Sequence, residues 1–287
     1  MDKKEHFLHD LFSLVMQNQS TILTMNTIAE FHAAMSRPDV KIDAIADIIK
    51  KDTGLTTSVL KSANSSFFGL SRRVSTVKQA VSVLGLKSLE RVLLTEALKS
   101  TLAGAHSKAL DDLWKHSLAT AVATQSIISI NYKNISEQAF TAGLLHDLGK
   151  LLLVNYKSDG MKQIMGHIEL NPLCPSSVLE IEIFGVDHQE IGEYFSKKWL
   201  FPDNVTDAIR YHHKLNNLSS SNLIPISVAV ANNIAKAMEF GKSTSGIIDT
   251  LPKWIWEPLK FKQSDFKKVV KETEKKFISL TEFLDDK

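Results

Sequence analysis

The sequence predicts an all-α protein, folded as a two-lobed helical bundle. Apolar residues recur at the spacing of a helical face through most of the 287 residues, and we find no convincing strand pattern. Twelve glycines and seven prolines are few for this length, whereas a β-sandwich or barrel needs many turns. Because the chain is also long for one domain, two packed units are expected.

The N-terminal part divides into short helices separated by capping residues. Ile42, Ile45 and Ile49 share one helical face. Asp52 can cap the following helix, because an aspartate side chain accepts hydrogen bonds from free backbone N–H groups. Gly85 is a suitable C-terminal stop. We expect helices over residues 42–51, 53–64, 77–85 and 86–102.

Small residues at 103–107 interrupt the pattern and mark a boundary between the lobes. Beyond it we expect helices over residues 110–130, 136–156, 187–199, 203–213 and 225–240, and a basic amphipathic helix from Asp265. The predicted organisation is an N-terminal helical lobe over residues 1–102, a larger lobe over residues 103–240 and a C-terminal helical extension over residues 241–287.

Composition argues against several classes of function. A net charge of +2 gives no electrostatic reason to expect a nucleic acid or an acidic membrane surface as partner. Cys174 is the only cysteine, so an internal disulfide and a cysteine-rich zinc site are excluded. The N-terminus is polar without a signal peptide, and no apolar run reaches the roughly 18 residues of a membrane span. We therefore expect a cytoplasmic protein.

The sequence indicates a functional site at the adjacent His146 and Asp147. Both residues lie inside the apolar run of residues 139–153. A carboxylate and an imidazole are costly to bury unless something compensates their desolvation. A bound cation that both side chains ligate is one compensator, and a buried hydrogen-bond network is the other. On a continuous helix the two side chains would fan about 100° apart, so both could reach a groove between helices.

Five of the ten histidines form a candidate constellation, each on a predicted helix or at its edge. Imidazole and carboxylate suit a borderline divalent ion such as Fe, Mn, Zn, Ni or Co. Inward-facing His and Asp side chains are a known way to build such a site inside a helical bundle. We expect the other five histidines, His32 among them, at the surface. The candidates are His116, His146, His188, His212 and His213, together with Asp147.

The order of these residues resembles the HD superfamily of metal-dependent phosphohydrolases. The resemblance implies that His116, His146, Asp147 and a late acidic residue hold one metal ion, which would activate water and neutralise phosphoryl oxygens. Near the motif Lys150 could contact a phosphate, although a solvated surface lysine is the simpler interpretation. The candidates for a second metal or a substrate phosphate are His188, His212, His213 and Lys150.

Six motifs in order are similar to the HDOD domain, a relative of these phosphohydrolases that occurs in bacterial signalling proteins. The resemblance covers roughly residues 20–240 and implies an HD-like fold for the second lobe. Many HDOD domains have lost metal ligands, and most have no demonstrated activity. The motifs are 52–56 (DTGLT), 60–65 (LKSANS), 74–80 (VSTVKQA), 114–117 (WKHS), 143–150 (GLLHDLGK) and 187–192 (DHQEIG).

Asn232 departs from the HD pattern, because it stands where the late acidic residue is expected, in the segment 231–235 (ANNIA). An amide oxygen ligates weakly and adds no negative charge to balance a divalent cation. With Asp147 as the only carboxylate ligand, we expect one ion (Fe, Mn, Zn or Ni) or none, and a hydrolytic two-metal centre is less favourable. A purely structural buried network is the alternative.

These observations favour a regulatory HDOD-type protein that binds a signalling partner protein or a nucleotide-like ligand and keeps a residual metal site. The alternative is a metal-dependent phosphohydrolase acting on a nucleotide or a cyclic dinucleotide, in which His188, His212 or His213 positions the phosphate. Asn232 favours binding, whereas the retained histidines favour metal. The sequence leaves homo-oligomerisation open.

Overall fold

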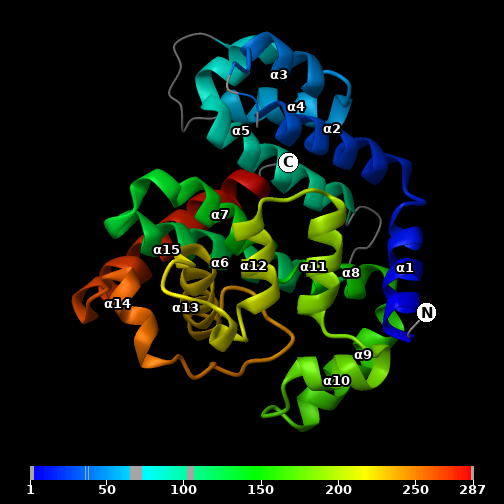
Figure 1. Cartoon of the computed structure of the whole chain (residues 1–287), viewed down its shortest axis with the longest axis vertical. Helices are drawn as coiled ribbons and strands as arrows, with labels where there is room; N and C mark the ends of the chain where they lie inside the picture. The colour runs from blue at the N-terminus through cyan, green and yellow to red at the C-terminus, as the bar shows by residue number, and fades with distance from the viewer. Residues whose placement is uncertain (1–2, 36, 38, 65–72, 102–106, 286–287) are drawn as a thin grey trace. The chain divides into compact units, whose positions relative to one another are not determined.

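The computed structural model describes residues 3–35, 37, 39–64, 73–101 and 107–285 (Figure 1). Over these residues every regular element is a helix and no strand occurs, which confirms the all-α prediction. None of the helices in these ranges is long and apolar enough to cross a membrane. Of the expected interruption at 103–107, only Ser107 lies within the described residues, where its side chain caps the next helix.

The chain divides into two compact units. The larger consists of Met1–Asp10, Gly104–Ser196 and Pro202–Lys287, and the smaller of Leu11–Ala103 with Lys197–Phe201. Helix α1 (Lys3–Val15) therefore begins in the larger unit and ends in the smaller. The smaller unit contains α2 (Gln19–Met35), α3 (Ile42–Ile49), α4 (Thr53–Ala63) and α5 (Val77–Thr101).

The smaller unit follows the capping pattern of its sequence, with α5 packed against α2, α3 and α4. Asp52 is the N-cap of α4: its side chain accepts one hydrogen bond from Leu55 N at 3.1 Å and another from Thr24 Oγ1 at 2.7 Å. Gly85 interrupts α5 with a φ of 72°, which L side chains rarely adopt. The predicted cap at Asp52 and the predicted stop at Gly85 are therefore confirmed.

The larger unit is built around α6 (Lys108–Asn131), which packs against α7, α8, α13 and α15. The helices that follow α6 in the chain are α7 (Ser136–Leu145), α8 (Leu148–Tyr156), α9 (Ser158–Leu170), α10 (Ser176–Phe184), α11 (His188–Lys198), α12 (Asp203–Tyr211), α13 (Leu223–Ala237), α14 (Trp256–Leu259) and α15 (Gln263–Asp285). Short 3-10 helices are η2 (Lys133–Ile135), η3 (Leu215–Asn217) and η4 (Lys253–Ile255).

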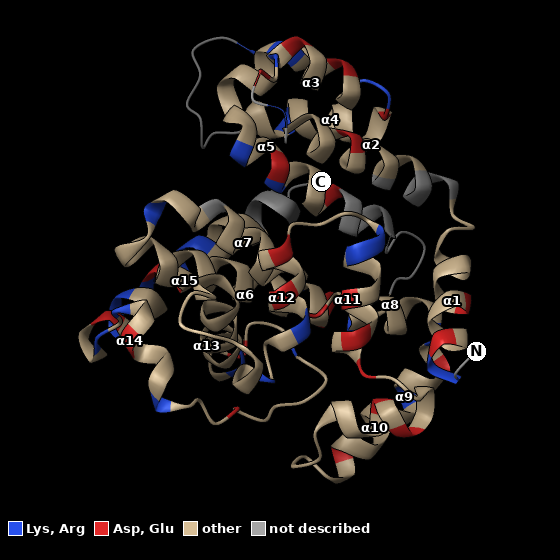
Figure 2. Ribbon diagram, viewed as in Figure 1, with Lys and Arg blue, Asp and Glu red and all other residues tan. Residues whose placement is uncertain are grey.

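Apolar side chains fill the core beside α6. Ile127 of α6 belongs to one buried cluster with Ile226 and Val230 of α13 and Val269 of α15. Trp256 of α14 packs against the edge of this cluster. Outside the core, Figure 2 shows basic and acidic residues interspersed along the helices, in keeping with the small net charge. Hydrophobic burial, the dominant favourable term in folding, thus holds α13 against α6.

The structure differs from the predicted elements in two ways. The single helix expected over residues 136–156 is two helices, α7 and α8, separated by a turn at His146 and Asp147. Asp147 has φ −100° and ψ 23°, outside the helical range. Because buried apolar residues flank the turn on both sides, apolar periodicity does not reveal it. In addition, the structure has helices in stretches for which the sequence pattern gave no prediction, namely α1, α2, α9, α10 and α14.

Candidate metal centre

The turn between α7 and α8 places His146 and Asp147 in the interior of the larger unit. Both side chains are fully buried (0 % exposed). His146 Nδ1 donates a hydrogen bond to Gly143 O at 2.8 Å, since a carbonyl oxygen can only accept. The proton on Nδ1 leaves the Nε2 lone pair free, and this buried Nε2 has no hydrogen-bond partner.

Asp147 lies between two groups of histidines. Its Oδ2 is 3.4 Å from His146 Nε2 and 3.9 Å from His116 Nε2. Its Oδ1 is 3.5 Å from both His188 Nε2 and His212 Nε2. The first group is His116, His146 and Asp147, and the second group is His188, His212 and His213; the candidate ligand atoms of each group lie within 4.8 Å of one another.

Hydrogen bonds through Nδ1 orient every histidine of the second group. His188 Nδ1 donates to Glu180 Oε2 at 2.6 Å, and His213 Nδ1 donates to Asp249 Oδ2 at 2.8 Å. His212 Nδ1 faces two backbone carbonyls of the last turn of α12, at 3.0 and 3.2 Å. In each ring the protonated Nδ1 leaves Nε2 as the electron-pair donor, which is the tautomer that a metal ligand needs.

His116 and Asn232 face each other beside the first group. His116, on α6, has its Nε2 3.0 Å from Asn232 Oδ1 on α13. Because an amide oxygen only accepts, His116 Nε2 donates this bond. His116 Nδ1 and Asn232 Nδ2 are buried and have no hydrogen-bond partner. The place of the expected late acid is thus taken by an uncharged acceptor whose own amide group is unsatisfied.

Lys150 supplies the positive charge next to Asp147. Its side chain is buried, and Nζ lies 3.0 Å from each carboxylate oxygen of Asp147. The ion pair therefore involves both oxygens, and Oδ2 accepts a hydrogen bond from Lys150. Lys150 Nζ also contacts Ser243 Oγ at 3.4 Å. Lys150 is therefore a buried counter-ion, and its interpretation as a solvated surface lysine is wrong.

Burial keeps three of the imidazoles neutral at pH 7. It lowers the pKa of His116 to about 3 and that of His213 to about 4, and it holds the pKa of His212 well below its usual value. Burial by itself would raise the pKa of Asp147, but Lys150 and His146 together hold it well below its usual range. Neutral imidazole donors thus surround an ionised carboxylate.

Glu180, on α10, is a residue of the site that the sequence did not reveal. It is fully buried and accepts hydrogen bonds from His188 N at 2.7 Å and from His188 Nδ1 at 2.6 Å. Burial by itself would raise the pKa of Glu180, but the contact with His188 lowers it. The available signal was an acidic residue eight positions before a candidate histidine, within the apolar helix of residues 176–184.

Asp249 is a second residue of the site that the sequence did not reveal. It lies on the segment of residues 239–252 between α13 and η4, which we call the strap. Its Oδ2 accepts the hydrogen bond from His213 Nδ1 and is 3.4 Å from Lys236 Nζ. Its backbone N and O pair with the Asn233 side chain at 2.9 and 2.8 Å. Burial by itself would raise the pKa of Asp249, but His213 lowers it to about 2. The hydrogen bond between His213 and Asp249 thus joins the strap to the second group.

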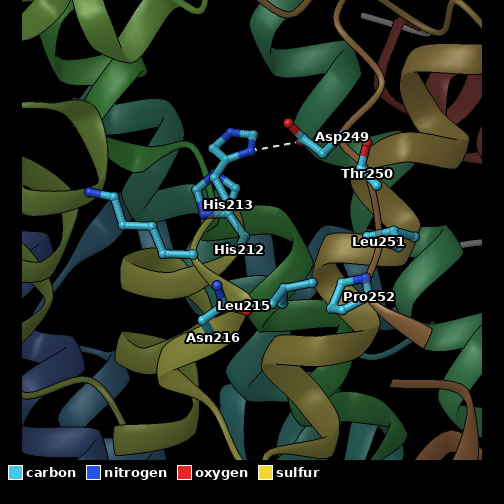
Figure 3. Close-up of a pocket in the computed structure, with 9 residues that line it drawn as sticks. His212, His213, Leu215, Asn216, Asp249, Thr250, Leu251 and Pro252 are labelled. Atoms are coloured by element: carbon cyan, nitrogen blue, oxygen red, sulfur yellow. Dashed lines mark hydrogen bonds and ion pairs between the residues drawn. The ribbon is translucent and has the colours of Figure 1, made fainter. Parts of the chain in front are cut away.

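A cavity of about 230 Å³ borders the second group (Figure 3). Its lining includes His212 and His213, which follow α12 directly, and the strap residues 249–252. Figure 3 shows the His213 ring joined to Asp249, with Leu251 and Pro252 farther along the strap. Among the residues that line it, none belongs to the first group. Access from this cavity therefore leads to the second group.

The structure brings all the predicted site residues together in the larger unit. One other expectation about the histidines is wrong, because His32 is largely buried beside Phe31 and Phe201 and has a lowered pKa from that burial. Apolar periodicity hides such a residue when a helix buries a broad face. The clustered residues are His116, His146, Asp147, Lys150, His188, His212, His213 and Asn232.

The donor set fits a divalent ion. His146 Nε2 is buried without a hydrogen-bond partner among the described residues, and unsatisfied buried polar atoms are costly unless something meets them. A purely structural network accounts for the Lys150–Asp147 ion pair and the His116–Asn232 bond. It does not account for His146 Nε2, whereas imidazole and carboxylate are the ligands of borderline divalent metals.

Acid should destabilise the metal-free protein before its carboxylates protonate. The pKa of His213 is about 4 in the folded chain and about 6.5 when unfolded, so protons favour the unfolded state. This contribution to stability is present above pH 6.5 and is lost as the pH falls from 6.5 to about 4, to a total of about 3 kcal/mol. Urea unfolding with EDTA at pH 7.5 and 4.5 measures it.

The variant His213→Gln is the control for this pH dependence, because it removes the titrating ring and should show a smaller loss between the two pH values. A urea midpoint that stays constant or rises on acidification of the unaltered protein would contradict the assigned burial of His213.

The profile of the HDOD domain matches residues 23–215, which is more than half of the chain. This chain belongs to the HDOD family. The match confirms the resemblance inferred from the motifs and includes both His146 and His188. It ends before Asn232 and the strap, so Asp249 and its contacts lie outside the matched region.

Solved structures of similar fold come from several bacteria. An HDOD domain protein of unknown function from Geobacter sulfurreducens is 26% identical, with a TM-score of 0.72 over 91% of each chain. A candidate signal transduction protein from Marinobacter aquaeolei is 22% identical, with a TM-score of 0.68 over 92% of this chain and 59% of the other. A candidate phosphohydrolase from Shewanella amazonensis is 20% identical, with a TM-score of 0.64 over 91% and 95%. The last two likenesses show the fold alone.

A curated relative, an uncharacterized protein from Treponema pallidum, is 29% identical over 201 residues. The match covers 66% of this chain and 36% of the relative, so the chain spans about a third of that protein's length. The activity of that longer protein therefore carries no direct assignment to this chain.

Proposed function

We propose that this protein is a regulatory binding module that holds a divalent ion in its buried His/Asp cluster and responds to a nucleotide-like ligand or a signalling partner. The observation that carries the proposal is the fully buried His146 Nε2, which has no hydrogen-bond partner in the described part of the chain and lies 3.4 Å from the buried carboxylate of Asp147. A cation between Asp147 and the surrounding Nε2 atoms would satisfy it.

The residues that would hold the ion and its ligand can be named. His116, His146, Asp147 and Asn232 are the candidate ligands that the HD pattern implies. Lys150 and the second group could hold a phosphate or a second ion. A bound divalent ion supplies positive charge that attracts phosphoryl oxygens and lowers the pKa of water. The chain itself contributes oriented imidazoles, one ionised carboxylate and a buried ammonium group.

Asn232 favours binding over hydrolysis. The amide brings no negative charge to the first group, and the buried Lys150 ammonium already neutralises Asp147. A second positive ion in this space would have few negative ligands to share. The cluster is therefore better suited to one ion with an anionic ligand than to a pair of catalytic ions.

The alternative function is a metal-dependent phosphohydrolase, and one observation favours it. The two oxygens of Asp147 face different histidine groups, at 3.4 Å and 3.5 Å from the nearest Nε2 atoms, so one carboxylate could bridge two ions. Its substrate class would be a nucleotide or a cyclic dinucleotide. Turnover of such phosphodiesters with Mn or Fe supplied decides between the two functions.

Elemental analysis of the purified protein tests the metal proposal. We expect about one divalent ion per chain after incubation with Zn, Mn or Fe and gel filtration, and its loss in the double variant His146→Ala/Asp147→Ala. The exposed pair His6→Ala/Asp10→Ala is the matched control and should retain the metal, because these side chains lie at the surface. An unaltered protein that takes up no ion would overturn the proposal.

A further inference from the structure

The second group carries outer carboxylate partners that the first group lacks. His188 and His213 donate from Nδ1 to the carboxylates of Glu180 and Asp249, at 2.6 and 2.8 Å. A carboxylate in this position fixes the ring orientation and raises the basicity of Nε2, and its loss typically weakens metal binding by about 10–100-fold. The second group is thus oriented as a set of metal ligands before any ion binds.

The first group is less well oriented. His116 Nδ1 has no hydrogen-bond partner, and its Nε2, the atom nearest Asp147, donates to Asn232 Oδ1. Metal binding at His116 would require this proton to move to Nδ1, where no acceptor is available. His146, like His212 of the second group, has a backbone carbonyl as its outer partner. Metal binding to the first group therefore has a free-energy cost of reorganisation that metal binding to the second group does not have.

Access also favours the second group. His213, whose side chain is 20 % exposed, lines the 230 Å³ cavity beside the buried His212, whereas no residue of the first group is among its lining residues. Asp147 Oδ1, which also faces Lys150 Nζ at 3.0 Å, is 3.5 Å from the Nε2 atoms of His188 and His212. An ion entering from the cavity would meet these imidazoles and this carboxylate oxygen before it reached the first group.

We infer that the first divalent ion binds to the second group, with Asp147 Oδ1, and that Glu180 and Asp249 are its positioning residues. This inference rests on the proposed metal binding, but it reverses the order of occupancy expected from the HD pattern, in which His116, His146 and Asp147 form the main site. Three imidazoles and one carboxylate select a borderline ion such as Zn, Co, Fe or Ni over Mg or Ca.

Titration of the metal-free protein with Co²⁺, followed by calorimetry and by the visible absorption of bound cobalt, tests the inference. Glu180→Gln and Asp249→Asn should each weaken the first equivalent by about 10–100-fold and shift its absorption bands. His116→Ala should keep the first equivalent and lose only a later, weaker one. Glu182→Gln, on the exposed face of α10, is the matched control and should bind as the unaltered protein does.

Each outcome has a distinct meaning. Loss of the first equivalent in His116→Ala, with normal binding in Asp249→Asn, would overturn the inference and leave the proposed metal binding intact. Absence of any cobalt binding in the unaltered protein would overturn both. Asp249 is partly exposed, so Asp249→Asn provides the test if Glu180→Gln fails to fold, which circular dichroism would reveal.

Discussion

Replacing Lys150 by methionine should destabilise the metal-free protein by about 3–5 kcal/mol. Methionine preserves most of the buried aliphatic stem but removes the ammonium group 3.0 Å from both oxygens of Asp147. The carboxylate is then buried without a full opposite charge, and breaking a buried ion pair in this way costs far more than the pair contributes. Urea unfolding in EDTA at pH 7.5 measures the loss.

A divalent ion should reduce the difference in unfolding free energy between Lys150→Met and the unaltered protein, because its charge can replace that of the missing ammonium group. Saturating Zn or Co should therefore raise the unfolding midpoint more in the variant. In the metal-free state, the double variant Asp147→Asn/Lys150→Met should be more stable than Lys150→Met alone, since it removes the unpaired charge. A loss below about 1 kcal/mol in Lys150→Met would contradict the buried ion pair.

The cluster could be predicted because its members carry chemistry that is rare in apolar helices. His146 and Asp147 stand in an apolar run, and their order relative to His188 resembles a known family. Glu180 and Asp249 could not be found in this way. Glu180 lies on α10, for which no helix was predicted, and Asp249 lies on a strap without periodicity. Their roles arise from tertiary contacts that join distant parts of the chain.

The helices themselves could be predicted where a capping residue coincides with a periodic apolar face. Asp52 and Gly85 mark such boundaries, and the structure has a cap and a left-handed glycine at these positions. The turn at His146 could not be predicted, because apolar residues flank it on both sides. Propensity is a weak guide at such a point, where buried contacts decide the backbone. This turn between α7 and α8 is important because it sets the directions of the His146 and Asp147 side chains.

Replacing Gly149 by alanine should destabilise the protein by more than about 4 kcal/mol. Gly149 is the second residue of α8, and a Cβ built there would lie 2.0 Å from His188 O and 2.7 Å from His188 C. These are backbone atoms at the start of α11, so neither a rotamer change nor a small side-chain shift relieves the contact. The two helices would have to separate.

Separation would also disturb the metal centre, because Asp147 lies two residues before Gly149 and its Oδ1 is 3.5 Å from His188 Nε2. Gly149→Ala should therefore lose Co²⁺ affinity as well as stability, if it folds. Gly166→Ala in α9 is the matched control: no atom lies within 4 Å of its added Cβ, so alanine should stabilise it by about 0.5–1 kcal/mol. Gly192→Ala would clash with a side-chain atom, Ile209 Cγ2, rather than with backbone, and should fall between them. An unfolding midpoint of Gly149→Ala equal to that of Gly166→Ala would contradict the close approach of α8 to α11. It would also contradict the contact of Asp147 with the second group.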